Sequence, residues 1–130
     1  GWRDRPLTPG NWVYRADARG SLALYGPANA EAAFVVRCEL PARRIVFSRA
    51  GRLSDEGTMS FTTTAGARGY PAQNGAGDPP YVVAATGAND GWLDELAFTR
   101  GRFAVATPGQ ATLVLPSWPQ MVRVFEDCRG

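Results

Sequence analysis

The fold class follows from residues 32–40, which read AAFVVRCEL. Apolar residues and a cysteine take every second position on one side of this run: Phe34, Val36, Cys38 and Leu40. Because successive side chains of a β-strand point to opposite faces, the alternation predicts a strand with one face in the core. Cys38 is therefore expected to point into that core.

Similar alternation continues along the chain in both directions. It predicts strands at about 12–15, 22–24, 44–49, 58–63, 81–86, 102–106 and 111–115. Leu22 and Leu24 share one face of their strand, and the Pro108-Gly109 dipeptide marks the turn of the last hairpin. We therefore expect a single domain spanning residues 1–130. It should be mainly β, an antiparallel β-sandwich or flattened β-barrel of about seven to nine strands.

Two short helices are expected, at about 90–99 and 117–128. Asn89 and Asp90 supply capping side chains before the first helix. In the second, Ser117 followed three residues later by Gln120 fits a capping box. Four side chains then share one face of this helix: Met121, Val124, Phe125 and Cys128.

Both cysteines thus face the core, one from a strand and one from a helix over the sheet. This placement predicts a Cys38–Cys128 disulfide, and the alternative is a pair of buried free thiols. Disulfides persist in oxidising compartments, so we expect a periplasmic or secreted protein. No charged-then-apolar segment precedes Trp2, so we expect any signal peptide to be absent from the printed chain.

Residues 64–80 are rich in glycine and proline and show no apolar period. They predict one long loop with a tight turn at Asn74-Gly75. Long loops in compact domains are often contact surfaces, which makes Tyr70 and Asn74 candidate contact residues. The alternative is a mobile insertion without a function.

The chain contains no histidine and no lysine. Imidazole-based triads, imidazole metal sites, Schiff-base chemistry and the P-loop are therefore excluded, and we expect no cofactor and no metal. Carboxylates remain, and Asp90, Asp94 and Glu95 form the main acidic cluster. At the start of a helix such acids usually complement the helix dipole, so a catalytic pair is the less favoured interpretation.

All 14 basic residues are arginines, and the formal net charge is only +2. This balance argues against nucleic-acid binding. Four arginines bracket one predicted strand as a candidate anion-binding patch, although a solvated strand is the alternative: Arg43, Arg44, Arg49 and Arg52. The apolar runs are much shorter than the roughly 20 residues of a transmembrane helix, so no membrane span is expected. Trp2 either caps the fold or is exposed.

Several C-terminal motifs carry a resemblance to known proteins. They are Gly101-Arg102-Phe103, the run LVLPSW at 113–118 and the run RVFEDCR at 123–129, together with Val36-Arg37-Cys38. With these motifs the chain resembles small exported alpha-proteobacterial proteins of unassigned function and, more remotely, periplasmic proteins of the invasion-associated locus B type. The resemblance implies a periplasmic or secreted β domain and assigns no site residues.

Together these features predict a non-catalytic periplasmic or secreted binding or accessory module that acts through a surface or loop. Its expected partner is a protein or another envelope component of unknown identity, and the sequence leaves the oligomeric state open. Two alternatives stay open: a carboxylate-dependent hydrolase and a small-ligand-binding β-barrel.

Overall fold

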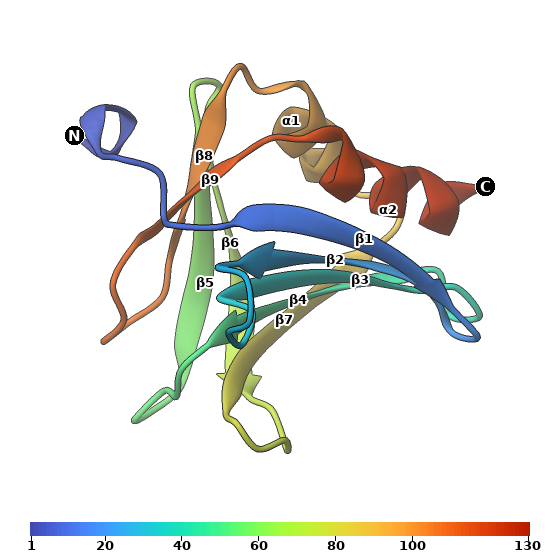
Figure 1. Ribbon diagram of the computed structural model, residues 1–130, viewed down its shortest axis with the longest axis horizontal. Helices are drawn as coiled ribbons and strands as arrows, with labels where there is room; N and C mark the ends of the chain where they lie inside the picture. Colours follow the sequence, from blue (N-terminus) through green and yellow to red (C-terminus); the bar gives the residue numbers. More distant parts are fainter.

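A computed structural model describes residues 1–130 and shows one curled antiparallel sheet with two helices (Figure 1). Nine strands form the sheet, in the order β1-β2-β3-β4-β7-β6-β5-β8-β9. The prediction of a mainly antiparallel β fold with two short helices is confirmed. The elements are η1 (Trp2–Asp4), β1 (Asn11–Asp17), β2 (Gly20–Gly26), β3 (Phe34–Glu39), β4 (Arg44–Ala50), β5 (Gly57–Thr63), β6 (Gly66–Asn74), β7 (Tyr81–Gly87), α1 (Trp92–Phe98), β8 (Arg102–Ala106), β9 (Leu113–Pro116) and α2 (Pro119–Arg129).

The sheet curls into a half-barrel whose two edges meet near the start of β1. The backbone N–H of Thr8 donates to the carbonyl of Val114 over 2.9 Å, and the Thr8 hydroxyl accepts from the Val114 N–H over 2.9 Å. The indole N–H of Trp12 donates to the Pro116 carbonyl over 2.8 Å. These bonds connect β1 to β9, the last strand in the order, and fix the curl.

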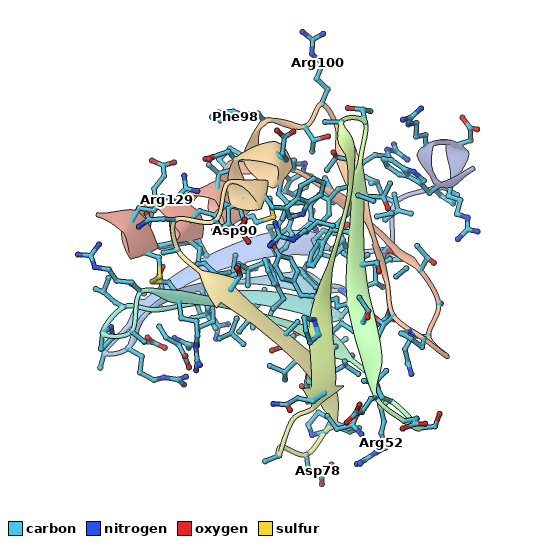
Figure 2. The ribbon with its side chains drawn as sticks, turned by 180° about the vertical axis from the view of Figure 1, so that it is seen from behind. Arg52, Asp78, Asp90, Phe98, Arg100 and Arg129 are labelled. Atoms are coloured by element: carbon cyan, nitrogen blue, oxygen red, sulfur yellow. A yellow bond between two sulfur atoms is a disulfide. The ribbon has the colours of Figure 1, made fainter.

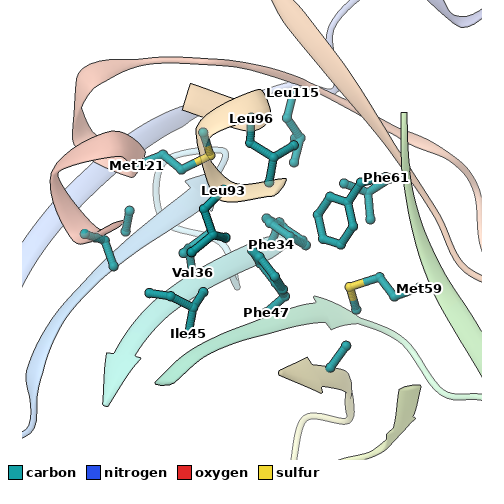
Figure 3. Close-up of a cluster of buried hydrophobic side chains, with 14 of the residues drawn as sticks. Phe34, Val36, Ile45, Phe47, Met59, Phe61, Leu93, Leu96, Leu115 and Met121 are labelled. Carbon is teal, nitrogen blue, oxygen red and sulfur yellow. The ribbon is translucent and has the colours of Figure 1, made fainter. Parts of the chain in front are cut away.

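Aromatic side chains fill the interior of the half-barrel (Figure 3). Phe47 and Phe61 are fully buried, with ring centroids 4.7 Å apart, and Phe34 packs against both. The helices cover the open end of the sheet, where α2 contacts β1 to β4 and α1 contacts α2. Leu93 and Leu96 of α1 are fully buried. Side chains therefore fill the core between the sheet and the helices.

The inward face of β2 is formed by two small residues and one aromatic residue, and its two leucines lie on the outward face. Ser21, Ala23 and Tyr25 are buried, whereas Leu22 and Leu24 point outward. Tyr25 pairs with Trp12 across the strands, and their rings meet edge-on with centroids 5.1 Å apart. The sheet therefore carries apolar side chains on its outward face as well.

The predicted Cys38–Cys128 disulfide is confirmed. It joins β3 to α2 with the two Cα atoms 5.4 Å apart, and both residues are fully buried. The predicted capping box of α2 is wrong, because the Ser117 hydroxyl donates to the carbonyl of Leu96 over 2.7 Å. The helix instead begins after Trp118, with Pro119 in its first turn. Ser117 therefore ties α2 to α1.

The expected loop at 64–80 is wrong for residues 66–74, which form strand β6. Residues 66–72 of this strand pair with the whole length of β5, from Thr63↔Gly66 to Gly57↔Ala72. Only Tyr70 and Ala72 of β6 are buried, so its sequence shows no apolar alternation. The pairing partner, and not the local pattern, makes this segment a strand. Only residues 75–80 remain as the connection to β7.

Candidate functional site

The outward face of the first half of the sheet carries aliphatic side chains in register. Val13 pairs with Leu24, which in turn pairs with Val35. In the next strands Ser48 continues this row to Val83. We call the whole set the aliphatic face: Val13, Leu22, Leu24, Val35, Val46 and Val83. Val13 is 49% exposed, and the other five are half-buried.

Two ion pairs lie at one end of the aliphatic face, and one of them reaches into it. The guanidinium of Arg37 donates to both carboxylate oxygens of Asp17, over 2.6 and 3.1 Å. These two hydrogen bonds lower the pKa of Asp17 to about 2. Arg44 donates to Glu39 over 2.5 and 2.8 Å and likewise holds the pKa of Glu39 below its usual value. Arg37 pairs in register with Leu22 and with Val46 and therefore lies within the aliphatic face, whereas Asp17, Glu39 and Arg44 lie at its end.

Two surface hollows lie at opposite sides of this face. One, of about 350 Å³, lies between β1, β2 and the loop after Gly26, and Val13 and Leu24 contribute to it. The other, of about 500 Å³, lies over β4, β7 and β6, and Val46 and Val83 contribute to it. A third hollow of about 280 Å³ lies near Tyr14 and Asp127. Each of the three hollows is lined by a single carboxylate residue.

The second half of the sheet has a different outward face. On β5 this face consists of Thr58, Ser60 and Thr62, none of which is buried. On β8 and β9 it contains Ala104 and Val114, which are only 4% and 2% exposed although they lie outside the core. The N-terminal segment accounts for this burial, since η1 contacts β8 and Thr8 bonds to Val114. The chain covers this apolar patch itself and leaves the aliphatic face uncovered.

The N-terminal segment also decides the position of Trp2, for which the sequence left two options. Trp2 lies in η1 and is half-buried, with the guanidinium of Arg3 5.6 Å from its ring centroid. Arg102 donates to the carbonyl of Arg5 over 2.6 Å and holds the segment against β8. Trp2 is therefore part of the cover over this end of the sheet.

Asp90 is the centre of a polar cluster between β6, β7 and α1. Its carboxylate accepts from the hydroxyls of Tyr70 and Thr86, over 2.6 and 2.7 Å, and from the Trp92 N–H over 2.9 Å. Burial alone would raise the pKa of Asp90, but these hydrogen bonds outweigh burial and hold the pKa below its usual value. Burial and the neighbouring carboxylate raise the pKa of Tyr70. All of these hydrogen bonds to Asp90 come from polar groups of the protein.

The four arginines of the predicted anion patch do not come together. Arg43 donates to the carbonyl of Arg129 over 2.8 Å, and Arg44 is paired with Glu39. Arg52 lies at the opposite end of the molecule from Arg129 (Figure 2). Strand β4 separates the two ends by roughly 20 Å, at about 3.3 Å per residue. The patch prediction is therefore wrong.

Arg49 also lies apart from the others, because it is on the inward face of β4. It is 7% exposed and donates to the carbonyls of Ala50 and Ala111, over 3.0 and 2.7 Å. Burial lowers the pKa of its guanidinium. The side chain connects β4 to the turn before β9. Its role is thus to join strands.

The predicted contact residues Tyr70 and Asn74 are both structural. Tyr70 is buried in the core, and its hydroxyl is bound to Asp90. The amide side chain of Asn74 accepts from the N–H of Leu53 and donates to its carbonyl, over 2.7 and 2.9 Å. These two hydrogen bonds hold the segment before β5 against the end of β6. Tyr70 is therefore not accessible to a partner, whereas Asn74 stays exposed at the end of β6.

The acids considered for catalysis also have structural partners of their own. Asp94 pairs with Arg129 over 2.6 Å, at the end of α2. The N-cap of α1 is Gly91, without a side-chain cap, so the predicted cap by Asn89 or Asp90 is wrong; Asp90 instead accepts from the Trp92 N–H from one position before the cap. Neither acid lines one of the three hollows. The cluster therefore stabilises the junction of the two helices.

Sequence reasoning missed the aliphatic face, although a signal for it was present. Strands buried on one face alternate strictly, but residues 34–36 and 81–83 are apolar at every position. Continuous apolar runs indicate strands with both faces covered. Val35 and Val83 lie on the outward face of β3 and β7 and are only half-buried, so these runs mark an apolar surface.

Comparison with models of protein families, with curated proteins and with solved structures gave no match. No helix of the structure has the length and apolar character needed to cross a membrane.

Proposed function

We propose that this protein is a non-catalytic binding module of the periplasm or the extracellular space, and that it binds a partner protein through the aliphatic face. The observation that carries the proposal is the row Val13, Leu24, Val35, Ser48 and Val83, which is in register, uncovered and apolar except for Ser48. Contiguous apolar patches on soluble proteins mark interaction sites.

The composition of the face supports a protein as the partner. Protein interfaces have an apolar centre, from which charged residues are depleted, and a polar rim. Here the row of Val13, Leu24 and Val35 is aliphatic, and the neighbouring row holds Arg37, which is paired with Asp17. The Glu39–Arg44 pair lies at the margin. Both charges of each pair are already neutralised by the other. The face therefore offers shape and apolar contact, and little net charge.

The disulfide supports the proposed compartment. A disulfide buried in the core is typical of proteins that fold in oxidising environments. The resemblance of the C-terminal motifs to exported proteins is consistent with that location.

The two alternative functions receive less support. A carboxylate-dependent hydrolase needs two acids across one cleft, whereas each hollow here is lined by one. A ligand-binding barrel needs a cavity, whereas Phe34, Phe47 and Phe61 occupy the interior.

Site-specific photo-crosslinking tests the proposal. A photoreactive residue at Leu24 is compared with one at Thr62, which lies outward on β5, in envelope extracts of the producing cells. We expect a discrete crosslinked band from Leu24 and none from Thr62. Equal crosslinking at both positions, or none at Leu24, would refute binding through the aliphatic face.

A further inference from the structure

Asn74 is the one asparagine of this chain that precedes a glycine. The other three precede Trp12, Ala30 and Asp90. Asparagine is a chemically labile residue, because the backbone nitrogen of the next residue can attack its side-chain amide carbon. Glycine favours this attack, since it has no side chain to obstruct the approach and its backbone is the most permissive. The sequence therefore makes Asn74 the asparagine most prone to deamidation.

The side chain of Asn74 has a structural role in the folded protein. Its Oδ1 accepts from the N–H of Leu53 over 2.7 Å, and its Nδ2 donates to the carbonyl of the same residue over 2.9 Å. We call these two hydrogen bonds the Asn74–Leu53 clamp. Leu53 is only 5% exposed and belongs to the core. The clamp therefore holds a core residue in place at the end of the molecule where Figure 2 shows Arg52.

Gly75 is required by the close approach of the end of β6 to β7. Its N–H donates to the carbonyl of Tyr81 over 2.7 Å. A Cβ at this position would lie 3.0 Å from Cγ2 of Val83 and 3.2 Å from the Tyr81 carbonyl oxygen, which is crowded. The clamp thus needs an asparagine and the strand contact needs a glycine. The reactive pair follows from these two structural requirements.

The same contacts oppose deamidation while the protein is folded. The reaction needs the Gly75 nitrogen without its proton and in contact with Cγ of Asn74. In the structure this N–H is bonded to Tyr81, and the side-chain amide is held toward Leu53 by two hydrogen bonds. All three bonds have to open before the ring can close. Deamidation is therefore limited by local opening at the end of β6.

The reaction itself needs only hydroxide and water, and Asn74 is exposed to solvent. Hydroxide removes the Gly75 amide proton, the bond from the Gly75 nitrogen to Cγ forms, the Cγ–Nδ2 bond breaks, and ammonia leaves. Water then opens the resulting succinimide ring. Opening at Cγ gives aspartate, whereas opening at the main-chain carbonyl carbon gives isoaspartate. One water is consumed and one ammonia is released in total.

Neither product can form the clamp again. An aspartate carboxylate only accepts hydrogen bonds, so the donor to the Leu53 carbonyl is lost and an oxygen takes its place. Isoaspartate adds a carbon atom to the backbone between residues 74 and 75. This position lies between the Asn74↔Val82 pair and the bond from Gly75 to Tyr81, so the register with β7 cannot be kept on both sides.

We propose that Asn74 is a self-modification site under the control of the Asn74–Leu53 clamp. The closed clamp suppresses deamidation, and deamidation after a local opening releases Leu53 permanently, because the ammonia is lost. This inference goes beyond the proposed function and does not depend on it, since Asn74 is not part of the aliphatic face.

Peptide mapping by mass spectrometry tests the suppression. The oxidised wild type and the reduced protein unfolded in urea are incubated at the same mildly alkaline pH, and conversion of each asparagine to acid is followed. We expect Asn74 to convert first in the unfolded chain. In the folded protein its conversion should be at least about tenfold slower, which corresponds to an opening free energy of about 1.4 kcal/mol. Equal rates in the two states, or earlier conversion of another asparagine in the unfolded chain, would overturn the proposal.

Two leucine variants test whether the clamp controls the reaction. Leu53→Ala keeps the backbone groups of the clamp but weakens the packing of Leu53 in the core. Leu96→Ala is the control, because it removes another buried leucine, in α1, which forms no part of the clamp. We expect Leu53→Ala to speed deamidation of Asn74 in the folded, oxidised protein more than Leu96→Ala does. Equal acceleration would show that global unfolding controls the reaction, and would contradict the proposal.

Amide hydrogen exchange tests the release of the clamp. The deamidated protein is separated from the unmodified protein by ion exchange, through its added negative charge. We expect the Gly75 N–H to exchange faster in the deamidated protein. Asn29→Asp adds the same charge in the exposed loop between β2 and β3 and should leave this exchange unchanged. Unchanged exchange at Gly75 after deamidation, or an equal increase with Asn29→Asp, would refute release of the clamp.

Discussion

The hydroxyl of Tyr70 donates a hydrogen bond to the carboxylate of Asp90 over 2.6 Å, and this bond connects β6 to the turn before α1. Thr86 donates to the same carboxylate from β7. The carboxylate therefore joins two strands at the place where their own ladder has ended. Arg68 adds an ion pair at 3.3 Å from the exposed side.

Replacing Asp90 by asparagine should lower the free energy of unfolding by about 1–3 kcal/mol, because one of the two accepting oxygens becomes an NH2 group. Either the hydroxyls of Tyr70 and Thr86 or the Trp92 N–H then lose their acceptor. Urea denaturation at neutral pH measures this change. Asp94→Asn is the control, since it breaks the half-exposed pair with Arg129 and should cost less than about 1 kcal/mol. Equal effects of the two substitutions would contradict a central role for Asp90.

The stability difference between wild type and Asp90→Asn should shrink in acid. The pKa of Asp90 is lowered in the folded protein, so the folded state binds the proton less readily than the unfolded chain. The carboxylate therefore contributes stability above its ordinary pKa of 3.8, and this contribution is lost as the pH falls through the lower folded value. Urea denaturation of both proteins from about pH 7 to about pH 3 measures the difference. A difference that does not change with pH would contradict the account.

The carboxyl group of Asp17 should titrate with a pKa of about 2, because Arg37 donates two hydrogen bonds to it. NMR titration of the side-chain carboxyl carbon measures this value. Arg37→Met keeps much of the side-chain length and should return the pKa toward 3.8. A wild-type pKa of Asp17 already near 3.8 would show that the two hydrogen bonds from Arg37 are not maintained in solution.

Removing the disulfide with Cys38→Ala and Cys128→Ala should lower the free energy of unfolding by about 2–5 kcal/mol. The bond closes a loop between residues 90 positions apart, and it fastens α2 over β3. Chemical denaturation of the double variant and of the reduced wild type should give similar losses. If neither protein is less stable than the oxidised wild type, the bond does not hold the fold together.

The parts of the fold that local pattern specifies were predictable from the sequence. Strict alternation placed Cys38 inward on its strand, and the helical spacing from Met121 to Cys128 placed the second cysteine, so their pairing followed. Strand β6 was not predictable, because its residues outside Tyr70 and Ala72 are exposed. Its structure depends on pairing with β5, which is a non-local interaction.

The candidate site was less predictable than the fold. The arginines from Arg43 to Arg52 are close in sequence, but β4 lies between them and keeps Arg43 and Arg52 apart. Side chains alternate between the two faces of this strand, and Arg49 is on the buried face. The aliphatic face draws on five strands, and it becomes visible only when the register brings Val13, Leu24 and Val35 into one row. Sheet order cannot be read from spacing along the chain.

Binding through the aliphatic face is tested most directly by the affinity of the partner crosslinked at Leu24 for three proteins. These are the oxidised wild type, Leu24→Asp and Thr62→Asp, and the measurement is isothermal titration calorimetry with the purified partner. We expect Leu24→Asp to weaken binding at least about tenfold, since an unpaired charge is costly in an apolar interface, and Thr62→Asp to bind as the wild type does. Unchanged affinity for Leu24→Asp, with its fold intact by circular dichroism, would contradict the proposed function.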